Sequence, residues 1–136
     1  LFWAKTIELK NIEDSFASAA NYLKTIGWKR NEPCFFKVEL KDNIPKKYLN
    51  SSARNIKNKR KVVFLKKYIK DFDNLNLNND LKAAIIIPDK DIIPGAETLS
   101  PAYIIFENYE KILNWNRSLR FALAVCTLKE SFKNEI

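Results

Sequence analysis

The sequence has no histidine among its 136 residues and only two cysteines. Without histidine, no mechanism can use an imidazole base. Cys34 and Cys126 lie far apart and neither has Cys-x-x-Cys spacing, so too few ligands remain for a zinc site. The two thiols could pair in an oxidising compartment, but we favour two buried free thiols, because cysteine is among the residues most often buried.

Long apolar runs are also absent. No uncharged apolar stretch approaches the roughly 20 residues of a membrane-spanning helix. No signal-peptide pattern is present and the first residue is Leu1 rather than Met, so we expect a fragment or a processed product of a longer chain. The 46% of hydrophobic residues is ordinary for a globular protein, and the length suits one domain with a real core.

Positive charge is in excess, with 24 Lys and Arg against 16 Asp and Glu and a net charge of +8. A basic balance favours acidic partners: nucleic acid, anionic lipid or an anionic polymer such as cell wall. The alternative is compositional, since Lys, Asn and Ile are all abundant, as in an AT-rich genome. The most basic clusters, Lys46-Lys47, 57–61 and Lys66-Lys67, are expected to form a solvated face.

Residues 11–26 predict an amphipathic helix, because apolar residues recur at three- and four-residue spacing. Asn11 suits the N-cap, and Asp14 can return the bond as in a capping box. Gly27 suits the position after the helix, where a left-handed conformation costs glycine little, and Trp28 can fold back on the last turn.

A small sheet is predicted in the middle of the chain. Residues 34–40 alternate apolar and charged side chains, and 82–87 and 102–106 are β-branched runs that most simply form neighbouring strands. The segments 46–59, 71–80 and 89–100 are expected to be surface excursions or loops. Residues 61–69 favour a short helix with Val62, Leu65 and Ile69 on one side, and a strand is the alternative.

Two helices are predicted at the end of the chain, at 107–114 and 118–133, with the turn Trp115 to Ser118 between them. Ser118 suits the N-cap of the second helix. This turn carries a large ring, an amide and a hydroxyl, and two helices hold it. It is therefore a way to present polar and aromatic groups to a ligand.

Two separated segments carry a resemblance to a known family. Residues 14–28 read DSFASAANYLKTIGW, and residues 101–128 hold an Asn-Tyr helix, an aromatic–Asn–x–Ser turn and an Ala-x-Ala-Val-x-x-Leu helix. Both resemble the lytic murein transglycosylases of the B type. Glu32-Pro33, Val38 and Pro88-Asp89 also fall where that family places a strand entry, a strand and a turn.

The resemblance implies an α+β fold, in which a lysozyme-like helical core carries an inserted antiparallel β module. The chain would form a single partial domain, with a core helix at 1–28, the module at 29–106 and the closing core helices at 107–136. The family cleaves the β-1,4 bond between N-acetylmuramic acid and N-acetylglucosamine, leaving a 1,6-anhydromuramic end. The expected function is therefore the glycan-positioning C-terminal portion of such an enzyme.

The catalytic acid of the family lies in a Glu-Ser-x-x-Gly-like motif, well before the Asn-Tyr-Leu helix. The present sequence has no such motif, so we expect no catalytic residue in it and the acid upstream in the parent protein. Glu107 and Glu110 are interpreted as solvated carboxylates favoured by the start of a helix.

The sugar-site residues implied by the resemblance are Trp115, Asn116, Ser118 and Phe121. Flat rings suit sugars because they cover the apolar face of a pyranose. The alternatives are structural: Phe121 has core spacing on an apolar helix, and Asn116 and Ser118 suit helix capping.

The remaining expectations concern ligands and location. Some members of the resembled family carry a calcium loop just before the Asn-Tyr-Leu helix, but residues 1–11 lack its Asp-x-Asp-Gly pattern, so we expect no calcium. No other metal and no cofactor is expected. The expected partner is peptidoglycan glycan strands, bound by a monomer in the periplasm or cell envelope of a Gram-negative bacterium. A membrane anchor in the parent protein is left open. A non-catalytic cell-wall-binding module is the second hypothesis. Nucleic acid is the least favoured partner, because the aromatic residues are not interleaved with the basic clusters.

Overall fold

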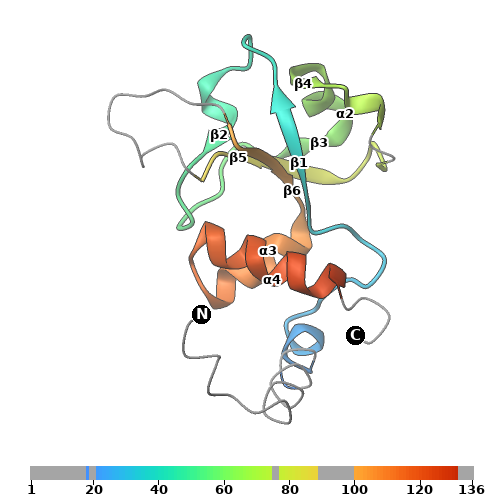
Figure 1. Cartoon of the computed structure of the whole chain (residues 1–136), viewed down its shortest axis with the longest axis vertical. Coiled ribbons are helices and arrows are strands. Elements are labelled where there is room, and N and C mark those ends of the chain that lie inside the picture. The colour runs from blue at the N-terminus through green and yellow to red at the C-terminus, as the bar shows by residue number, and fades with distance from the viewer. Residues whose placement is uncertain (1–17, 19–20, 75–76, 89–99, 132–136) are drawn as a thin grey trace.

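The computed structural model describes residues 18, 21–74, 77–88 and 100–131. In Figure 1 the strands occupy the upper part of the molecule and the two C-terminal helices lie beneath them. The elements in chain order are β1 (Phe35–Leu40), η2 (Lys46–Tyr48), β2 (Leu49–Asn50), β3 (Arg60–Lys61), α2 (Val62–Leu65), η3 (Lys66–Tyr68), β4 (Ile69–Lys70), η4 (Phe72–Asn74), β5 (Lys82–Ile86), β6 (Ala102–Ile105), α3 (Glu107–Trp115) and α4 (Leu119–Ser131).

The sheet has the order β2-β5-β6-β1-β4, and β3 pairs with β5 off this path. The predicted pairing of the two β-branched runs is confirmed, since β5 and β6 are antiparallel with Ile85 opposite Ile104. The other pairs in the predicted antiparallel module are antiparallel as well, except at one edge, where the short β2 runs parallel to β5. Parallel pairing needs a crossover connection, and the segment between β2 and β5 supplies one.

The two central strands are buried on both faces. Along β5, Ala83 and Ile85 face the core of the β module, and Ala84 and Ile86 face a second core shared with α3 and α4. Such burial explains why the strand reads as an uninterrupted apolar run rather than an alternating one. The sheet therefore joins the module to the helices that carry the predicted site.

The first helix ends as predicted. Ser18 and residues 21–25 are helical, and Gly27 has a φ of +88°. The N–H of Trp28 donates to Leu23 O at 2.9 Å and that of Gly27 to Lys24 O at 3.2 Å. These two bonds are the Schellman pattern, which satisfies carbonyls left open at a helix end.

The segment 46–59 is more ordered than predicted. Tyr48 and Asn50 are 5% and 7% exposed, although a surface excursion was expected there. Asn50 is buried because its amide is satisfied: Oδ1 accepts from Lys57 N at 2.8 Å, and Nδ2 donates to Lys57 O and Ile85 O at 3.1 and 3.0 Å. A buried amide with partners avoids most of its desolvation cost. Composition alone does not reveal such a residue.

The segment 61–69 contains both structures that its sequence allows. Residues Val62–Leu65 form α2, η3 follows, and Ile69 begins the two-residue strand β4. Val62, Leu65 and Ile69 are at most 2% exposed, so the predicted apolar side is confirmed. The segment 71–80 also holds a turn of 3-10 helix, η4, with Phe72 buried.

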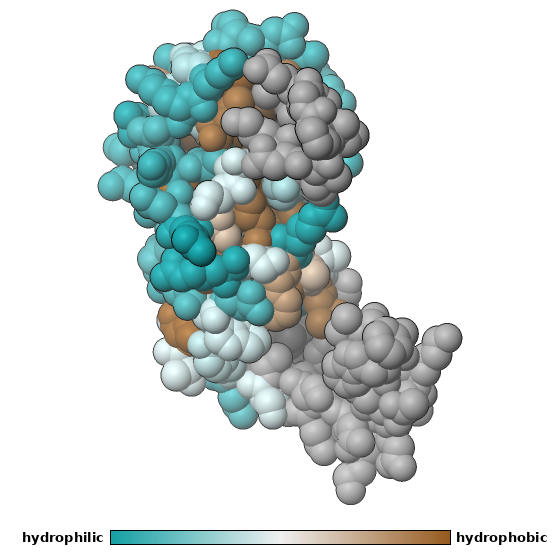
Figure 2. Space-filling view, turned by 90° about the vertical axis from the view of Figure 1, so that its left-hand side faces the viewer, coloured by the Kyte–Doolittle hydropathy of each residue, from teal (hydrophilic) through white to brown (hydrophobic). Residues whose placement is uncertain are grey.

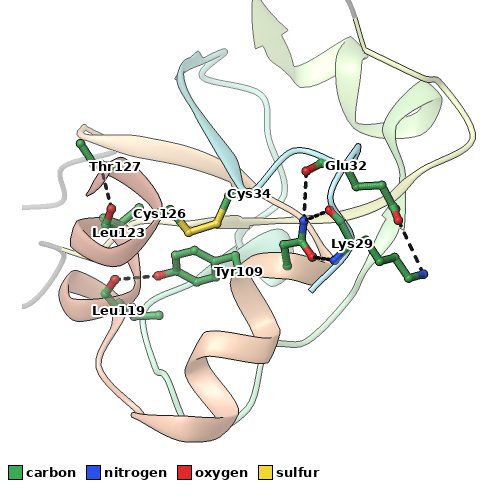
Figure 3. Close-up of a disulfide and its surroundings, with 9 residues drawn as sticks. Lys29, Glu32, Cys34, Tyr109, Leu119, Leu123, Cys126 and Thr127 are labelled. Carbon is green, nitrogen blue, oxygen red and sulfur yellow. Dashed lines mark hydrogen bonds and ion pairs between the residues drawn. A yellow bond between two sulfur atoms is a disulfide. The ribbon is translucent and has the colours of Figure 1, made fainter. Parts of the chain in front are cut away.

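Cys34 and Cys126 form a disulfide, so the prediction of free thiols is wrong (Figure 3). Their Cα atoms are 6.0 Å apart across 92 residues of sequence. The bond links the entry of β1 to the middle of α4 at the edge of the second core. The two cysteines meet only because the fold brings the start of β1 next to α4, and no local sequence pattern indicates that contact.

Several predictions fall outside the described residues. They are the N-cap Asn11 with Asp14, the absence of a calcium loop at 1–11, nearly all of the loop 89–100, and the last residues of the helix 118–133. Within the described residues, no helix is long and apolar enough to cross a membrane.

Candidate functional site

The turn between α3 and α4 is closed by its own polar groups. The N–H of Asn116 donates to Ile112 O at 2.9 Å, which ends α3, and the N–H of Ser118 donates to Asn116 O at 2.8 Å. Ser118 Oγ accepts from the N–H of Phe121 at 3.2 Å, so the predicted N-cap of α4 is confirmed. The cap uses Oγ as an acceptor and leaves the hydroxyl proton available as a donor.

A buried tyrosine fixes the two helices to each other. Tyr109 is 0% exposed, and its hydroxyl donates to Leu119 O at 2.7 Å (Figure 3). Burial raises the pKa of the Tyr109 phenol well above its ordinary value. The phenol therefore stays protonated and keeps donating, which holds the start of α4 in place beside the turn.

Three aromatic rings meet at this turn. The ring of Trp115 lies 4.6 Å from that of Tyr22, centroid to centroid, and 5.6 Å from that of Phe121 in an edge-on arrangement. Trp115 remains 48% exposed. Its ring is therefore braced on two sides and still offers a large surface to solvent, as a sugar-stacking ring requires.

The four predicted sugar-site residues lie together but differ in exposure. Trp115 and Asn116 are exposed, whereas Ser118 and Phe121 are partly buried. Phe121 packs against the second core, as the alternative interpretation of its position on an apolar helix predicted. Their role in binding sugar stays a prediction. Sequence reasoning missed Tyr22, because a contact between residues 93 positions apart leaves no trace in local spacing.

Asn108 is a second residue that sequence reasoning missed. Its side chain is fully buried, with Oδ1 accepting from Lys29 N at 2.8 Å. Its Nδ2 donates to Lys29 O at 2.8 Å and to Glu32 O at 3.0 Å. One amide thus pins the turn after the first helix to the start of α3. The one sequence feature that could have indicated it is the Asn-Tyr pair that Asn108 forms with Tyr109 in the family resemblance.

The carboxylates at the start of α3 are paired rather than simply solvated. Glu107 Oε2 lies 2.8 Å from Lys29 Nζ and Glu107 Oε1 lies 3.5 Å from Lys111 Nζ, and Glu110 lies 3.0 Å from Lys59 Nζ. The hydrogen bond from Lys29 holds the pKa of Glu107 below its ordinary value. A general acid requires the opposite shift, so Glu107 does not fit the role of the catalytic acid.

Two cavities open beside these elements. The larger, of about 880 Å³, is lined by residues from 28–37, which include the start of β1, from 77–81 and from the end of α4. The smaller, of about 500 Å³, is lined mainly by charged residues, including Lys29, Lys59 and Glu110. The predicted sugar-site residues line neither cavity. At 48% exposed, the ring of Trp115 is accessible at the surface, as contact with one stretch of a long polymer requires.

No metal centre is visible in the part of the chain that the structure describes: no three His, Cys, Asp or Glu side chains gather there.

The sheet packs against α3 and α4 on one face, and Trp115 is exposed at the turn between these helices. The chain is therefore a mixed α and β protein with an exposed aromatic side chain at its helix turn. The family model for the Transglycosylase SLT domain matches residues 5–130. The chain therefore belongs to this family, and the resemblance inferred from two segments is confirmed.

Solved structures support the same fold. SltB3 from Pseudomonas aeruginosa in complex with NAG-NAM-pentapeptide matches at 28% identity and a TM-score of 0.63, covering 88% of this chain and 30% of that one. Its complex with NAG-anhNAM-pentapeptide matches at 29% identity and a TM-score of 0.62, with the same coverage. Catenated lytic transglycosylase SltB1 from the same organism, at 23% identity and a TM-score of 0.56, supports the fold alone.

The present chain thus spans about a third of the length of these structures, 30% of SltB3 and 36% of SltB1. No curated protein matches it.

Proposed function

We propose that the chain is the glycan-positioning C-terminal portion of a peptidoglycan lytic transglycosylase. The reaction would cleave the β-1,4 bond between N-acetylmuramic acid and N-acetylglucosamine and leave a 1,6-anhydromuramic end. The observation that carries the proposal is the half-exposed ring of Trp115, braced by Tyr22 and Phe121. It lies at the turn where the family resemblance places sugar contacts. Related SltB3 was solved with NAG-NAM and NAG-anhNAM pentapeptides, which supports this substrate class.

In this proposal the chain binds and orients the glycan. Trp115 covers the apolar face of one sugar ring, while the amide of Asn116 and the hydroxyl of Ser118 meet its polar groups. A single carboxyl group then suffices for the reaction. It protonates the leaving oxygen, and the resulting carboxylate takes the proton from the sugar's own C6 hydroxyl, which attacks the anomeric carbon. We propose that this acid is supplied by residues outside the present sequence.

We also propose that the protein works in the periplasm or cell envelope of a Gram-negative bacterium, as a monomer. The Cys34–Cys126 disulfide supports an oxidising compartment, because reducing cytoplasm rarely tolerates structural disulfides.

The test is product analysis. The full-length gene product should release muropeptides with 1,6-anhydro ends from purified peptidoglycan, as read by mass spectrometry, and the 136-residue chain should bind peptidoglycan without releasing any. Release of ordinary reducing ends would contradict the proposed reaction. Release by the 136-residue chain alone would contradict an acid outside it.

A non-catalytic cell-wall-binding module is the second candidate. It shares the exposed ring of Trp115 and needs no general acid, and neither Glu107 nor Glu110, each held in an ion pair, is set up as one. Tight binding by the full-length product, with no release of muropeptides under any condition, would select this candidate.

A further inference from the structure

The positive charge of the chain is concentrated in one segment. Residues 46–70 hold ten of the 24 Lys and Arg and none of the 16 Asp and Glu. The rest of the chain therefore carries 14 basic and 16 acidic residues, close to balance. The segment forms the outer part of the β module, from η2 to β4. On the one face that Figure 2 shows, hydrophilic residues cover much of the upper part of the molecule.

The two halves of this segment meet through aromatic rings. The ring of Tyr48 lies 5.5 Å from that of Phe64 and 6.1 Å from that of Tyr68, centroid to centroid. Asn58 Nδ2 also donates to Lys47 O at 2.6 Å, which ties the middle of the segment to its start. The sequence suggested that aromatic and basic residues are not interleaved, and the fold shows that they are.

Basic side chains lie over these rings. Lys47 Nζ and Arg60 Cζ are 5.2 and 5.6 Å from the ring centroid of Tyr48, and Lys67 Nζ is 4.0 Å from that of Phe64. Such contacts hold a cation in place at little cost. Among the described residues, no ion pair joins Lys47, Arg60 or Lys67 to a carboxylate. We call Lys47, Arg60 and Lys67, with the three rings, the basic face; the exposed Lys61 and Lys66 adjoin it in the sequence.

An exposed apolar side chain precedes Lys66 and Lys67 by three and four residues in the helical run from α2 to η3, a spacing that puts them on one side of a helix. Val63 on α2 is 46% exposed, between Lys61 and Lys66 in the sequence. Cations that surround an exposed apolar group suit a bilayer interface, where the cations meet phosphates and the apolar group enters the headgroup region. Bases of single-stranded nucleic acid need open ring faces for stacking. Tyr48 is only 5% exposed and lies beneath two cations, so the face favours a bilayer over nucleic acid.

We propose that the basic face binds the surface of an anionic phospholipid bilayer. The cations contact headgroup phosphates, and Val63 inserts at the interface. The binding is peripheral and reversible, and it uses residues separate from the proposed sugar site at Trp115. The β module would then hold the enzyme beside a membrane while the helix turn faces the glycan.

Co-sedimentation of the 136-residue chain with lipid vesicles tests this proposal. The chain should bind phosphatidylglycerol-containing vesicles, bind pure phosphatidylcholine vesicles far less, and lose affinity as salt is raised. Lys66→Gln with Lys67→Gln should weaken binding about 30-fold, since each basic residue near an anionic membrane is worth about a fivefold factor. The matched control, Lys24→Gln with Lys37→Gln, removes the same charge from exposed residues outside the segment and should change binding less than threefold.

The apolar contact has its own matched pair. Val63→Ser should weaken vesicle binding severalfold at high salt, where the electrostatic part is screened. Leu128→Ser, at a side chain exposed to 45% on α4, should leave it unchanged. Equal losses in the two lysine pairs, or no vesicle binding at 50 mM salt, would overturn the proposal. Binding to a single-stranded oligonucleotide without binding to vesicles would assign the face to nucleic acid instead.

Discussion

Replacement of Trp115 by alanine is the most direct test of the sugar surface. A tryptophan side chain can bury up to about 250 Å², and Trp115 is 48% exposed, so about 120 Å² is available to a ligand. A flat sugar covers one face of the ring, or about 60 Å² of that area. At about 25 cal/mol per Å², this contact is worth about 1.5 kcal/mol, a factor of roughly ten in the dissociation constant. Trp115→Ala should therefore weaken binding to purified peptidoglycan about tenfold.

The assay is sedimentation of the 136-residue chain with insoluble peptidoglycan, with the unbound protein measured by absorbance. Leu128→Ala is the matched control, because Leu128 is 45% exposed on α4 and has no predicted role in the site. Trp115→Phe should fall between wild type and alanine, since it keeps a smaller flat ring. Equal losses in Trp115→Ala and Leu128→Ala, or a loss below twofold in a variant with wild-type thermal unfolding, would refute the argument.

Three further predictions concern stability. Reduction of Cys34–Cys126, which closes a loop of about 92 residues, should lower the free energy of unfolding by up to about 4.6 kcal/mol, seen as a lower Tm in reducing buffer; an unchanged Tm would show that the bond is not formed. Asn108→Ala leaves three backbone groups without their hydrogen-bond partner and should lower the free energy of unfolding by about 2–4 kcal/mol, measured in urea. A decrease under about 1 kcal/mol would contradict this. The pKa of Glu107 is lowered by Lys29, so its pairing stabilises the fold above about pH 4.5 and is lost as pH falls through the lowered pKa. Between pH 5 and pH 3 the Tm of the wild type should therefore fall further than the Tm of Glu107→Gln. An equal fall in both proteins would argue against the ion pair.

Local patterns in the sequence predicted much of the fold. The end of the first helix at Gly27, the strands β1, β5 and β6, and the N-cap Ser118 all depend on neighbours within a few residues. These features follow from backbone sterics, alternation and capping, which a short window of sequence contains.

Long-range contacts escaped prediction. The buried Asn50, the Cys34–Cys126 bond and the brace of Tyr22 on Trp115 each join groups that only the folded chain brings together. For the site, the sequence identified Trp115 through a resemblance, but its exposure and the packing of its neighbours come from the tertiary arrangement.

The β module has a narrow neck. The chain enters it through residues 29–34 and leaves it through residues 106–108. These two segments are hydrogen-bonded to each other: Phe106 N–H donates to Cys34 O at 3.1 Å, and the side-chain amide of Asn108 bonds the backbone of Lys29. A segment whose two ends meet can vary in length with little strain on the rest of the fold. The outer part of the module, with its basic face, could therefore be lengthened, shortened or exchanged during evolution without displacing the helices that carry Trp115. Such an arrangement would let the outer surface of the module diverge while the helix pair and its exposed tryptophan stay constant.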